Sequence, residues 1–146
     1  MIRKMTEQDL NAVLKIEKES FFDYWNREQY LYELHENPYA ELYVLVIDDK
    51  IIGYYDLWII FDHAEIANIA ISSEWRNKHY GKKLMEDIEE KAIENNCETI
   101  SLEVRVSNLS AIKLYENSGF ITINTKKNYY KTSRGYEDGY FMMKGI

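Results

Sequence analysis

The sequence predicts a single α/β (α+β) domain with a central, mostly antiparallel mixed sheet flanked by helices. Three β-rich runs follow one another in the middle of the chain, at residues 41–47, 51–61 and 65–71. Asp48-Asp49-Lys50 lies between the first two runs and is a hairpin signal, so this part of the chain reads as an antiparallel meander. A helical pattern then separates the meander from an alternating run at residues 99–106.

The first part of the chain predicts one strand and two helices. These elements are a strand at residues 2–4, a helix from a Thr6 cap to Ser20, and a helix from an Asn26–Gln29 capping box to Glu36. The apolar face of the first helix consists of Leu10, Val13, Leu14 and Ile16. Asn37-Pro38 ends the second helix, because the residue before proline avoids the helical conformation. The aromatic run at residues 21–25 either plugs the core or walls a substrate groove.

The second half of the chain predicts two helices and three strands. These are a helix ending near residues 95–96, a strand at 99–106, a short helix at 108–117, and closing strands at 120–125 and 140–144. In the first of these strands, alternation separates Ile100, Leu102, Val104 and Val106 from Ser101, Glu103 and Arg105. Gly119 is expected to stop the short helix in a left-handed conformation. Residues 126–139 are expected to connect the closing strands.

Composition restricts the class of protein. With 146 residues, 46% of them hydrophobic and 29% charged, the chain fits one globular domain at residues 1–146. No apolar run reaches membrane-spanning length and the N-terminus lacks a secretory signal, so we expect a cytoplasmic protein without a membrane partner. Cys97 is the single cysteine and the three histidines show no metal spacing, so no metal is expected. Cys97 also has no evident base that would make it a nucleophile.

The net charge of −7 argues against nonspecific binding to nucleic acid and favours a cationic partner, although it could equally serve solubility. The sequence does not separate a monomer from a homodimer.

Residues 66–84 predict a phosphate-binding turn. An apolar strand leads through a basic loop into a helix whose apolar positions Leu84, Ile88 and Ala92 recur every four residues. The unpaired amides and the dipole at the start of a helix favour an anion such as pyrophosphate, here around residues 79–83. Lys78, Lys82 and Lys83 add full positive charges. The GxxxxGK[ST] and GxGxxG nucleotide motifs are both absent.

Two motifs make the chain similar to the GNAT family of N-acetyltransferases. Arg76-x-x-His79-x-Gly81 resembles the family's [QR]-x-x-G-x-[GA] coenzyme signature, with His79 where the family has glycine. A histidine there means either that φ is ordinary or that coenzyme affinity is reduced. The segment from Asn108 to Phe120 matches the second signature, N-x-x-A-x-x-L-Y-x-x-x-G-F, at every fixed position. The resemblance implies the GNAT acyl-CoA N-acyltransferase fold and acetyl-CoA as cosubstrate.

Within the family the chain most resembles the RimI-type ribosomal-protein-alanine N-acetyltransferases. The similar features are the strand at residues 65–71, the aromatic run ending in Trp25, and Asn128-Tyr129-Tyr130 with the later Glu137-Asp138. Phe22-Asp23-Tyr24-Trp25 departs from the proline-tryptophan pair that is more common in that group.

The resemblance assigns roles to particular residues. Glu103 is the expected general base, acting on the amine through water, and Tyr115 is the expected acid that protonates the leaving thiolate. Main-chain groups of Ile69 and Ile71 would pair with the pantetheine arm like an added strand. The coenzyme-binding set is Ile69, Ala70, Ile71, Arg76, Asn77, Lys78, His79, Tyr80, Gly81, Lys82, Asn108 and Tyr115. The acceptor-binding set is Tyr24, Trp25, Asn68 and Tyr130.

The leading expectation is therefore an enzyme that transfers the acetyl group of acetyl-CoA to the N-terminal α-amino group of a protein, such as a ribosomal protein. One alternative is acetylation of a small amine, namely a polyamine, an amino sugar or an amino acid. A closed pocket walled by Tyr24, Trp25 and Tyr130 would favour it. The other alternative, encouraged by His79, is a catalytically silent acetyl-CoA-binding module.

Overall fold

The computed structural model describes residues 1–146 and confirms the predicted fold class: seven strands form one mixed sheet in the order β1-β2-β3-β4-β5-β7-β6. The strands are β1 (Ile2–Lys4), β2 (Ala40–Ile47), β3 (Lys50–Ile60), β4 (His63–Ile71), β5 (Thr99–Arg105), β6 (Ile121–Thr132) and β7 (Gly135–Gly145). The helices are α1 (Leu10–Ser20), α2 (Arg27–His35), α3 (Tyr80–Glu94) and α4 (Leu109–Asn117), with short 3-10 turns η1 (Glu7–Asp9) and η2 (Ser73–Trp75). Only β4 and β5 pair in parallel. No helix combines the length and the apolar character needed to cross a bilayer.

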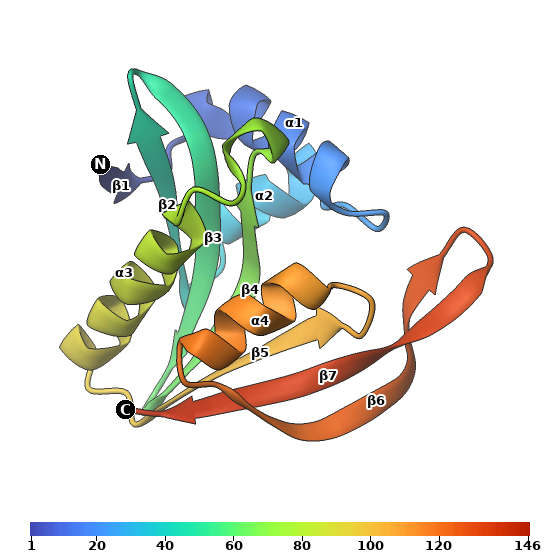
Figure 1. Cartoon of the computed structure of the whole chain (residues 1–146). Helices are drawn as coiled ribbons and strands as arrows, with labels where there is room; N and C mark the ends of the chain where they lie inside the picture. Colours follow the sequence, from blue (N-terminus) through green and yellow to red (C-terminus); the bar gives the residue numbers. More distant parts are fainter.

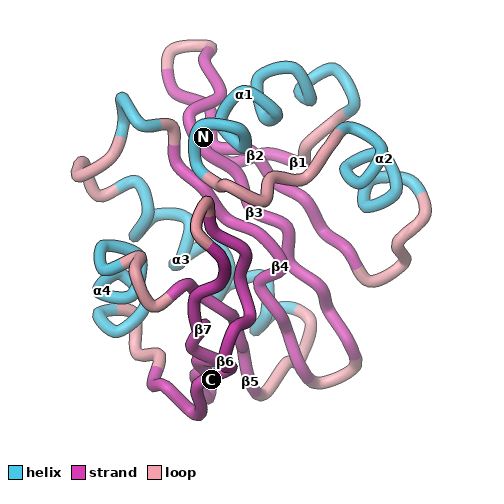
Figure 2. The backbone as a smooth tube through the Cα atoms, turned by 90° about the vertical axis from the view of Figure 1, so that its right-hand side faces the viewer, coloured by secondary structure: helices cyan, strands magenta, loops and turns pink.

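The sheet separates two hydrophobic clusters, each covered by one pair of helices. Helices α1 and α2 lie on one face, and α3 and α4 lie on the other (Figures 1 and 2). The predicted positions Leu84, Ile88 and Ala92 of α3 are buried in the larger cluster together with Tyr115 of α4. The smaller cluster contains Leu10, Val13 and Ile16 of α1, with Tyr30 of α2. Because neighbouring residues of a strand point to opposite faces, β3 contributes Tyr54 to the smaller cluster and Tyr55 to the larger one.

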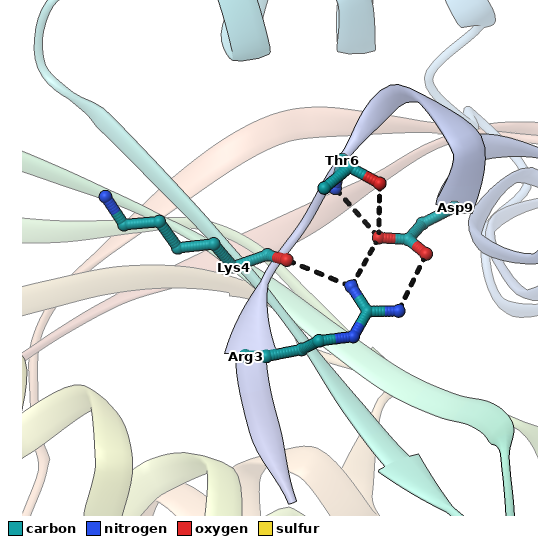
Figure 3. A network of polar contacts seen from close by, with 4 residues as sticks. All are labelled: Arg3, Lys4, Thr6 and Asp9. Carbon is teal, nitrogen blue, oxygen red and sulfur yellow. Dashed lines mark hydrogen bonds and ion pairs between the residues drawn. The ribbon is translucent and has the colours of Figure 1, made fainter.

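A polar network fixes the N-terminal entry to α1. The guanidinium of Arg3 donates to both carboxylate oxygens of Asp9 at 2.8 and 2.9 Å, and the amide of Thr6 donates to Asp9 at 2.8 Å (Figure 3). Arg3 also donates to the carbonyl of Lys4 at 3.1 Å. The Arg3 guanidinium holds the pKa of the Asp9 carboxyl below its usual range. Thr6 therefore caps a short 3-10 turn, and the α-helix itself begins at Leu10.

The prediction of a connector at residues 126–139 is wrong. β6 continues to Thr132 and β7 begins at Gly135, so the closing strands form one long hairpin that extends past the rest of the sheet (Figure 1). β6 is an edge strand and most of its side chains are exposed, so it lacks the apolar alternation that marks a buried strand. Its pairing register also shifts twice, between Thr122 and Asn124 and between Lys126 and Tyr130.

Strands β4 and β5 pair along only part of their length. The register between β3 and β4 passes from Asp56↔Asn68 to Leu57↔Ile66, which leaves Ala67 as an extra, bulged residue. Such a bulge bends its strand and ends local pairing. Pairing with β5 accordingly covers four residue pairs, 63–66 with 99–102, after which the two strands move apart (Figure 1). We call this region, residues 67–71 and 103–105, the β4–β5 divergence.

Candidate active site

The loop before α3 adopts the backbone conformation that its glycine-based motif would require. Asn77 and His79 both have positive φ, 61° and 67°, and His79 is the residue immediately before the helix. The interpretation of an ordinary φ at His79 is therefore wrong. Histidine tolerates the left-handed region better than most residues, at a cost of roughly 1–2 kcal/mol. The chain thus keeps the geometry of the loop without glycine at this position.

The first turn of α3 has free donors. The backbone amides of Tyr80, Gly81 and Lys82 have no acceptor within the chain, and no side chain caps the helix. Lys78, which lies 5.4 Å over the ring of Trp75, and Lys82 are exposed beside them. Unpaired amides, a helix dipole and lysines together fit the pyrophosphate of a coenzyme.

Arg76 holds this loop in place. Its Nε donates to the carbonyl of Ile71 at 3.0 Å, and its guanidinium also donates to the hydroxyl of Ser20 at 3.0 Å. The amide of Ser73 donates to Glu19 at 3.1 Å, which ties η2 to the end of α1. The Arg76 side chain therefore acts as a brace between the loop, β4 and α1. Its predicted role in coenzyme binding remains a prediction.

At the β4–β5 divergence, the main-chain polar groups of β4 point alternately toward β3 and toward the edge that β5 has left. Ser72 donates to the carbonyl of Ile52, so by alternation the polar groups of Ala70 also turn toward β3. Those of Ile69 and Ile71 turn toward the free edge, where the Ile69 amide donates to the side chain of Asn68 at 3.0 Å. Ile69 and Ile71 are thus placed as expected for pairing with an extended ligand. Ala70 has no free main-chain group to offer.

Helix α4 brings Tyr115 against the start of α3. A Cβ atom on Gly81 would lie 2.9 Å from a methyl group of Leu114, so glycine is needed for this close approach. Tyr115 follows in sequence, is 6% exposed and packs on Phe120. Burial raises the pKa of Tyr115, and its hydroxyl has no hydrogen-bond partner within the chain. Asn108 caps α4 through its side chain.

Glu103 lies on β5 where β4 turns away. Its carboxylate forms an ion pair with Lys126 and accepts a hydrogen bond from the hydroxyl of Tyr129 at 3.0 Å. Glu65 of β4 faces the same side, and burial together with the charge of Glu103 raises the pKa of Glu65. Because Glu103 points away from the Leu102 face, it lies on the α1–α2 side of the sheet.

Tyr130 lies beside Arg105 at the end of β5. Its ring lies 4.6 Å from the guanidinium carbon of Arg105, which also pairs with Glu137 at 3.0 Å. Burial raises the pKa of the Tyr130 phenol, and the nearby Glu103 and, more weakly, Tyr115 raise it further. Tyr130 also follows Tyr129, whose hydroxyl donates to Glu103, and the two tyrosine rings lie 5.0 Å apart.

A buried carboxylate organises the aromatic run between α1 and α2. Glu17 is 1% exposed and accepts hydrogen bonds from the amide of Trp25 at 2.9 Å and from the hydroxyls of Tyr30 and Tyr54 at 2.9 and 2.6 Å. The side-chain amide of Asn68 also donates to Glu17, at 2.8 Å. Asn68 and Trp25, both in the predicted acceptor set, are thus held by one residue.

Three further predictions concern Tyr24, the pocket predicted for a small amine, and Cys97. Tyr24 is exposed, with Lys18 5.8 Å above its ring. The cavity of about 420 Å³ on this side of the molecule includes Trp25 but neither Tyr24 nor Tyr130. Cys97 is buried, and burial raises the pKa of its thiol, the opposite of what a nucleophilic cysteine needs.

Comparison with known proteins decides the family, because the model of the acetyltransferase (GNAT) family matches residues 10–120. The chain belongs to the GNAT family. It is 40% identical over 141 residues to a candidate ribosomal protein bS18-alanine N-acetyltransferase of Bacillus subtilis strain 168, covering 97% of this chain and 92% of that one. The crystal structure of the ribosomal-protein-S18-alanine N-acetyltransferase from Escherichia coli superposes with a TM-score of 0.92, at 27% identity over 100% of this chain and 93% of the other. Chaetomium thermophilum Naa20 in complex with a bisubstrate analogue gives 0.84, at 26% identity over 100% and 86%.

The chain is therefore a GNAT N-acetyltransferase, of the RimI type among its relatives. Sequence reasoning missed three features of this GNAT site. They are the partners of Glu103, the carboxylate of Glu65, and the role of Glu17 in holding the aromatic run at residues 21–25. Lys126 and Tyr129 lie in the segment that was predicted to be a connector, so no predicted strand pairing put them beside Glu103. Glu17 could have been noticed as a charge within one turn of the apolar positions of α1.

Proposed function

We propose that this GNAT enzyme uses acetyl-CoA to acetylate the N-terminal α-amino group of a protein, with a ribosomal protein as acceptor and the cytoplasm as its place of action. The observation that carries the proposal is the carboxylate of Glu103, which Lys126 and Tyr129 hold at the β4–β5 divergence, beside the edge of β4 that faces away from β3. The relatives support the acceptor, since the names of two of them specify alanine of ribosomal protein S18.

The coenzyme-binding elements lie on the α3–α4 side. The free amides of Tyr80, Gly81 and Lys82 suit a pyrophosphate, and the free edge of β4 at Ile69 and Ile71 suits an extended pantetheine arm. Bound acetyl-CoA would supply an acetyl group activated as a thioester.

Glu103 suits the role of base. An α-amino group has a pKa of about 8 and is mostly protonated at neutral pH, so it must lose a proton before it can attack. Lys126 and Tyr129 orient the Glu103 carboxylate, which would receive that proton through water. The acceptor would reach Glu103 from the α1–α2 side, opposite the coenzyme.

Tyr115 suits the role of acid. Its hydroxyl is free of partners within the chain, and its raised pKa keeps it protonated at neutral pH. It would hold a proton for the departing sulfur, which leaves better as a thiol than as a thiolate.

The test is acetyl-CoA turnover with a basic peptide that begins with alanine. Glu103→Gln and Tyr115→Phe are expected to lower kcat/KM by about a hundredfold or more, as loss of general acid–base catalysis predicts, while calorimetry shows coenzyme binding retained. Glu116→Gln on α4 and Tyr136→Phe on β7 are matched controls, since both side chains are exposed.

Absence of turnover with the wild-type enzyme would remove the protein acceptor. Turnover of spermidine or an amino sugar in the same assay would then favour the small-amine alternative. Coenzyme binding without turnover of any amine would favour the silent module.

A further inference from the structure

The cavity of about 420 Å³ beside α2 has the composition of a site for an organic cation. Its walls include the rings of Trp25, Tyr32 and Trp58, and its charged groups are the carboxylates of Glu28 and Glu33. Asn26 and Gln29 complete the lining. Aromatic faces attract cations through the ring quadrupole, and carboxylates add direct charge attraction.

The two carboxylates are not neutralised by the chain itself. Neither Glu28 nor Glu33 forms an ion pair with a lysine or arginine. Arg27, the nearest cation in sequence, donates instead to the side chain of Asn11 on α1. No cation of the chain therefore cancels the negative charge of Glu28 and Glu33.

Buried groups hold Glu33 in place. The indole Nε1 of Trp58 donates to Glu33 at 2.6 Å, and the amide of Asn37 donates to its other oxygen at 2.8 Å. Asp56 lies behind Glu33, is 0% exposed, and has no donor for either carboxyl oxygen. Burial, and then the neighbouring Glu33, raise the pKa of Asp56 to about 10, so Asp56 keeps its proton at neutral pH and donates it to Glu33. The floor of the cavity thus carries one negative charge in a fixed position.

We propose that this cavity binds a lysine or arginine side chain of the acceptor polypeptide, downstream of the acetylated amine. The proposal rests on the proposed function, because it assumes that the acceptor is a polypeptide. Trp25 belongs both to the cavity wall and to the predicted acceptor set, so the cavity borders the region where the acceptor is proposed to bind.

The strand register gives the position of the basic residue in the acceptor. Trp58 pairs with Glu65, Glu65 pairs with Ser101, and Glu103 lies two residues beyond Ser101 on the same face. Two strand spacings across and two residues along correspond to roughly 12 Å between Trp58 and Glu103. An extended peptide advances roughly 3.3 Å per residue, so the basic side chain is expected at about the third to fifth residue of the acceptor.

The kinetic test compares two peptides that both begin with alanine. One carries arginine at residues 3 to 5 and the other carries norleucine there. The wild-type enzyme is expected to prefer the arginine peptide by about tenfold or more in kcat/KM, and Glu28→Gln and Trp58→Leu are expected to reduce that ratio severalfold. Glu36→Gln, an exposed charge change at the end of the same helix, is expected to keep the ratio. Equal use of both peptides by the wild-type enzyme would overturn the subsite and leave the proposed function standing.

A binding test covers the case in which no peptide is turned over. The probe is the same arginine peptide with its N-terminus already acetylated, followed by NMR of the three tryptophan indole groups. The signals of Trp25 and Trp58 are expected to shift, with Trp75 in η2 as an internal reference, and the shifts are expected to weaken in Glu28→Gln. Absence of shifts at Trp25 and Trp58, or equal shifts in Glu28→Gln, would overturn the subsite whatever the outcome of the turnover assay.

Discussion

Three carboxyl groups are buried between the sheet and helices α1 and α2, those of Glu17, Glu33 and Asp56. The chain offsets the cost of their desolvation in two different ways. Glu17 accepts hydrogen bonds from four residues, and Glu33 accepts from Asn37, Trp58 and the protonated Asp56. Asp56 has no donor and keeps its proton instead. A buried polar group must be hydrogen-bonded or neutral, because an isolated charge in the interior is too costly.

Asp56 makes stability depend on pH. In the folded state its pKa is raised to about 10, whereas an unfolded aspartate titrates at about 3.9. Between these values the folded state binds more protons than the unfolded state, so the contribution of Asp56 to stability falls as pH rises through this window. Asp56→Asn is expected to raise the free energy of unfolding at pH 8 by about 1–3 kcal/mol, because asparagine can donate to Glu33 without having to bind a proton.

Urea unfolding at pH 5, 7 and 9 provides the measurement. The gain from Asp56→Asn is expected to grow with pH, whereas Asp23→Asn, an exposed matched change in the aromatic run, is expected to have little effect at any pH. A gain that stayed constant or shrank with pH would contradict a protonated Asp56.

At the scale of elements, the loop before α3 depends on one backbone conformation. His79 adopts φ of 67°, which a β-branched residue resists more strongly and glycine adopts freely. His79→Gly is expected to change the free energy of unfolding by less than about 1 kcal/mol, and His79→Val is expected to lower it by about 1–3 kcal/mol.

Calorimetry with acetyl-CoA reports on the same loop. His79→Val is expected to weaken coenzyme binding by about tenfold, because a shifted residue 79 moves the amides at the start of α3, whereas His79→Gly is expected to keep it. Lys78→Val, at a neighbouring position without positive φ, is the stability control. Equal stability of the glycine and valine variants would show that the backbone conformation carries no strain.

Sequence reasoning found elements that carry either a buried apolar pattern or, like α2, a capping box. The structure confirms the helical spacing of Leu84, Ile88 and Ala92 and the alternation in β5. Both patterns arise because these side chains pack in the core. The tip of the β6–β7 hairpin has no buried apolar pattern. Its strands are held by backbone pairing and by Tyr130 lying against Gly139, where a Cβ atom would approach the ring to 2.7 Å. Cross-strand contacts of this kind are not visible in the sequence of either strand alone.

At the scale of the whole molecule, the two candidate binding regions differ in local charge. Lysines surround the start of α3, whereas Glu28, Glu33, Glu65 and Glu103 lie on the α1–α2 side, where the acceptor is proposed to bind. The site residues that motifs could predict, Glu103 and Tyr115, come from single short segments. This acidic surface could not be predicted, because its residues come from α2, β4 and β5 and meet only in the folded chain.

Salt is therefore expected to lower the kcat/KM of the enzyme for a basic acceptor peptide more than for a neutral one. For a basic acceptor peptide, kcat/KM is expected to fall severalfold between about 0.05 and 0.5 M NaCl, because screening shortens the reach of the acidic surface. A peptide with norleucine in place of its basic residues is expected to lose much less. The measurement is steady-state kinetics at saturating acetyl-CoA, and equal salt dependence of the two peptides would contradict electrostatic recognition of the acceptor.

The short seam between β4 and β5 has a mechanical consequence. Four residue pairs and the ring of His63, bonded to Thr99 and Ser101 at 2.6 and 2.8 Å, are what joins β1–β4 to β5–β7 within the sheet. Opening of the sheet is therefore expected to begin at the end of this seam, where Leu102 is the last paired residue and Glu103 the next, so that opening would change the surroundings of the candidate base.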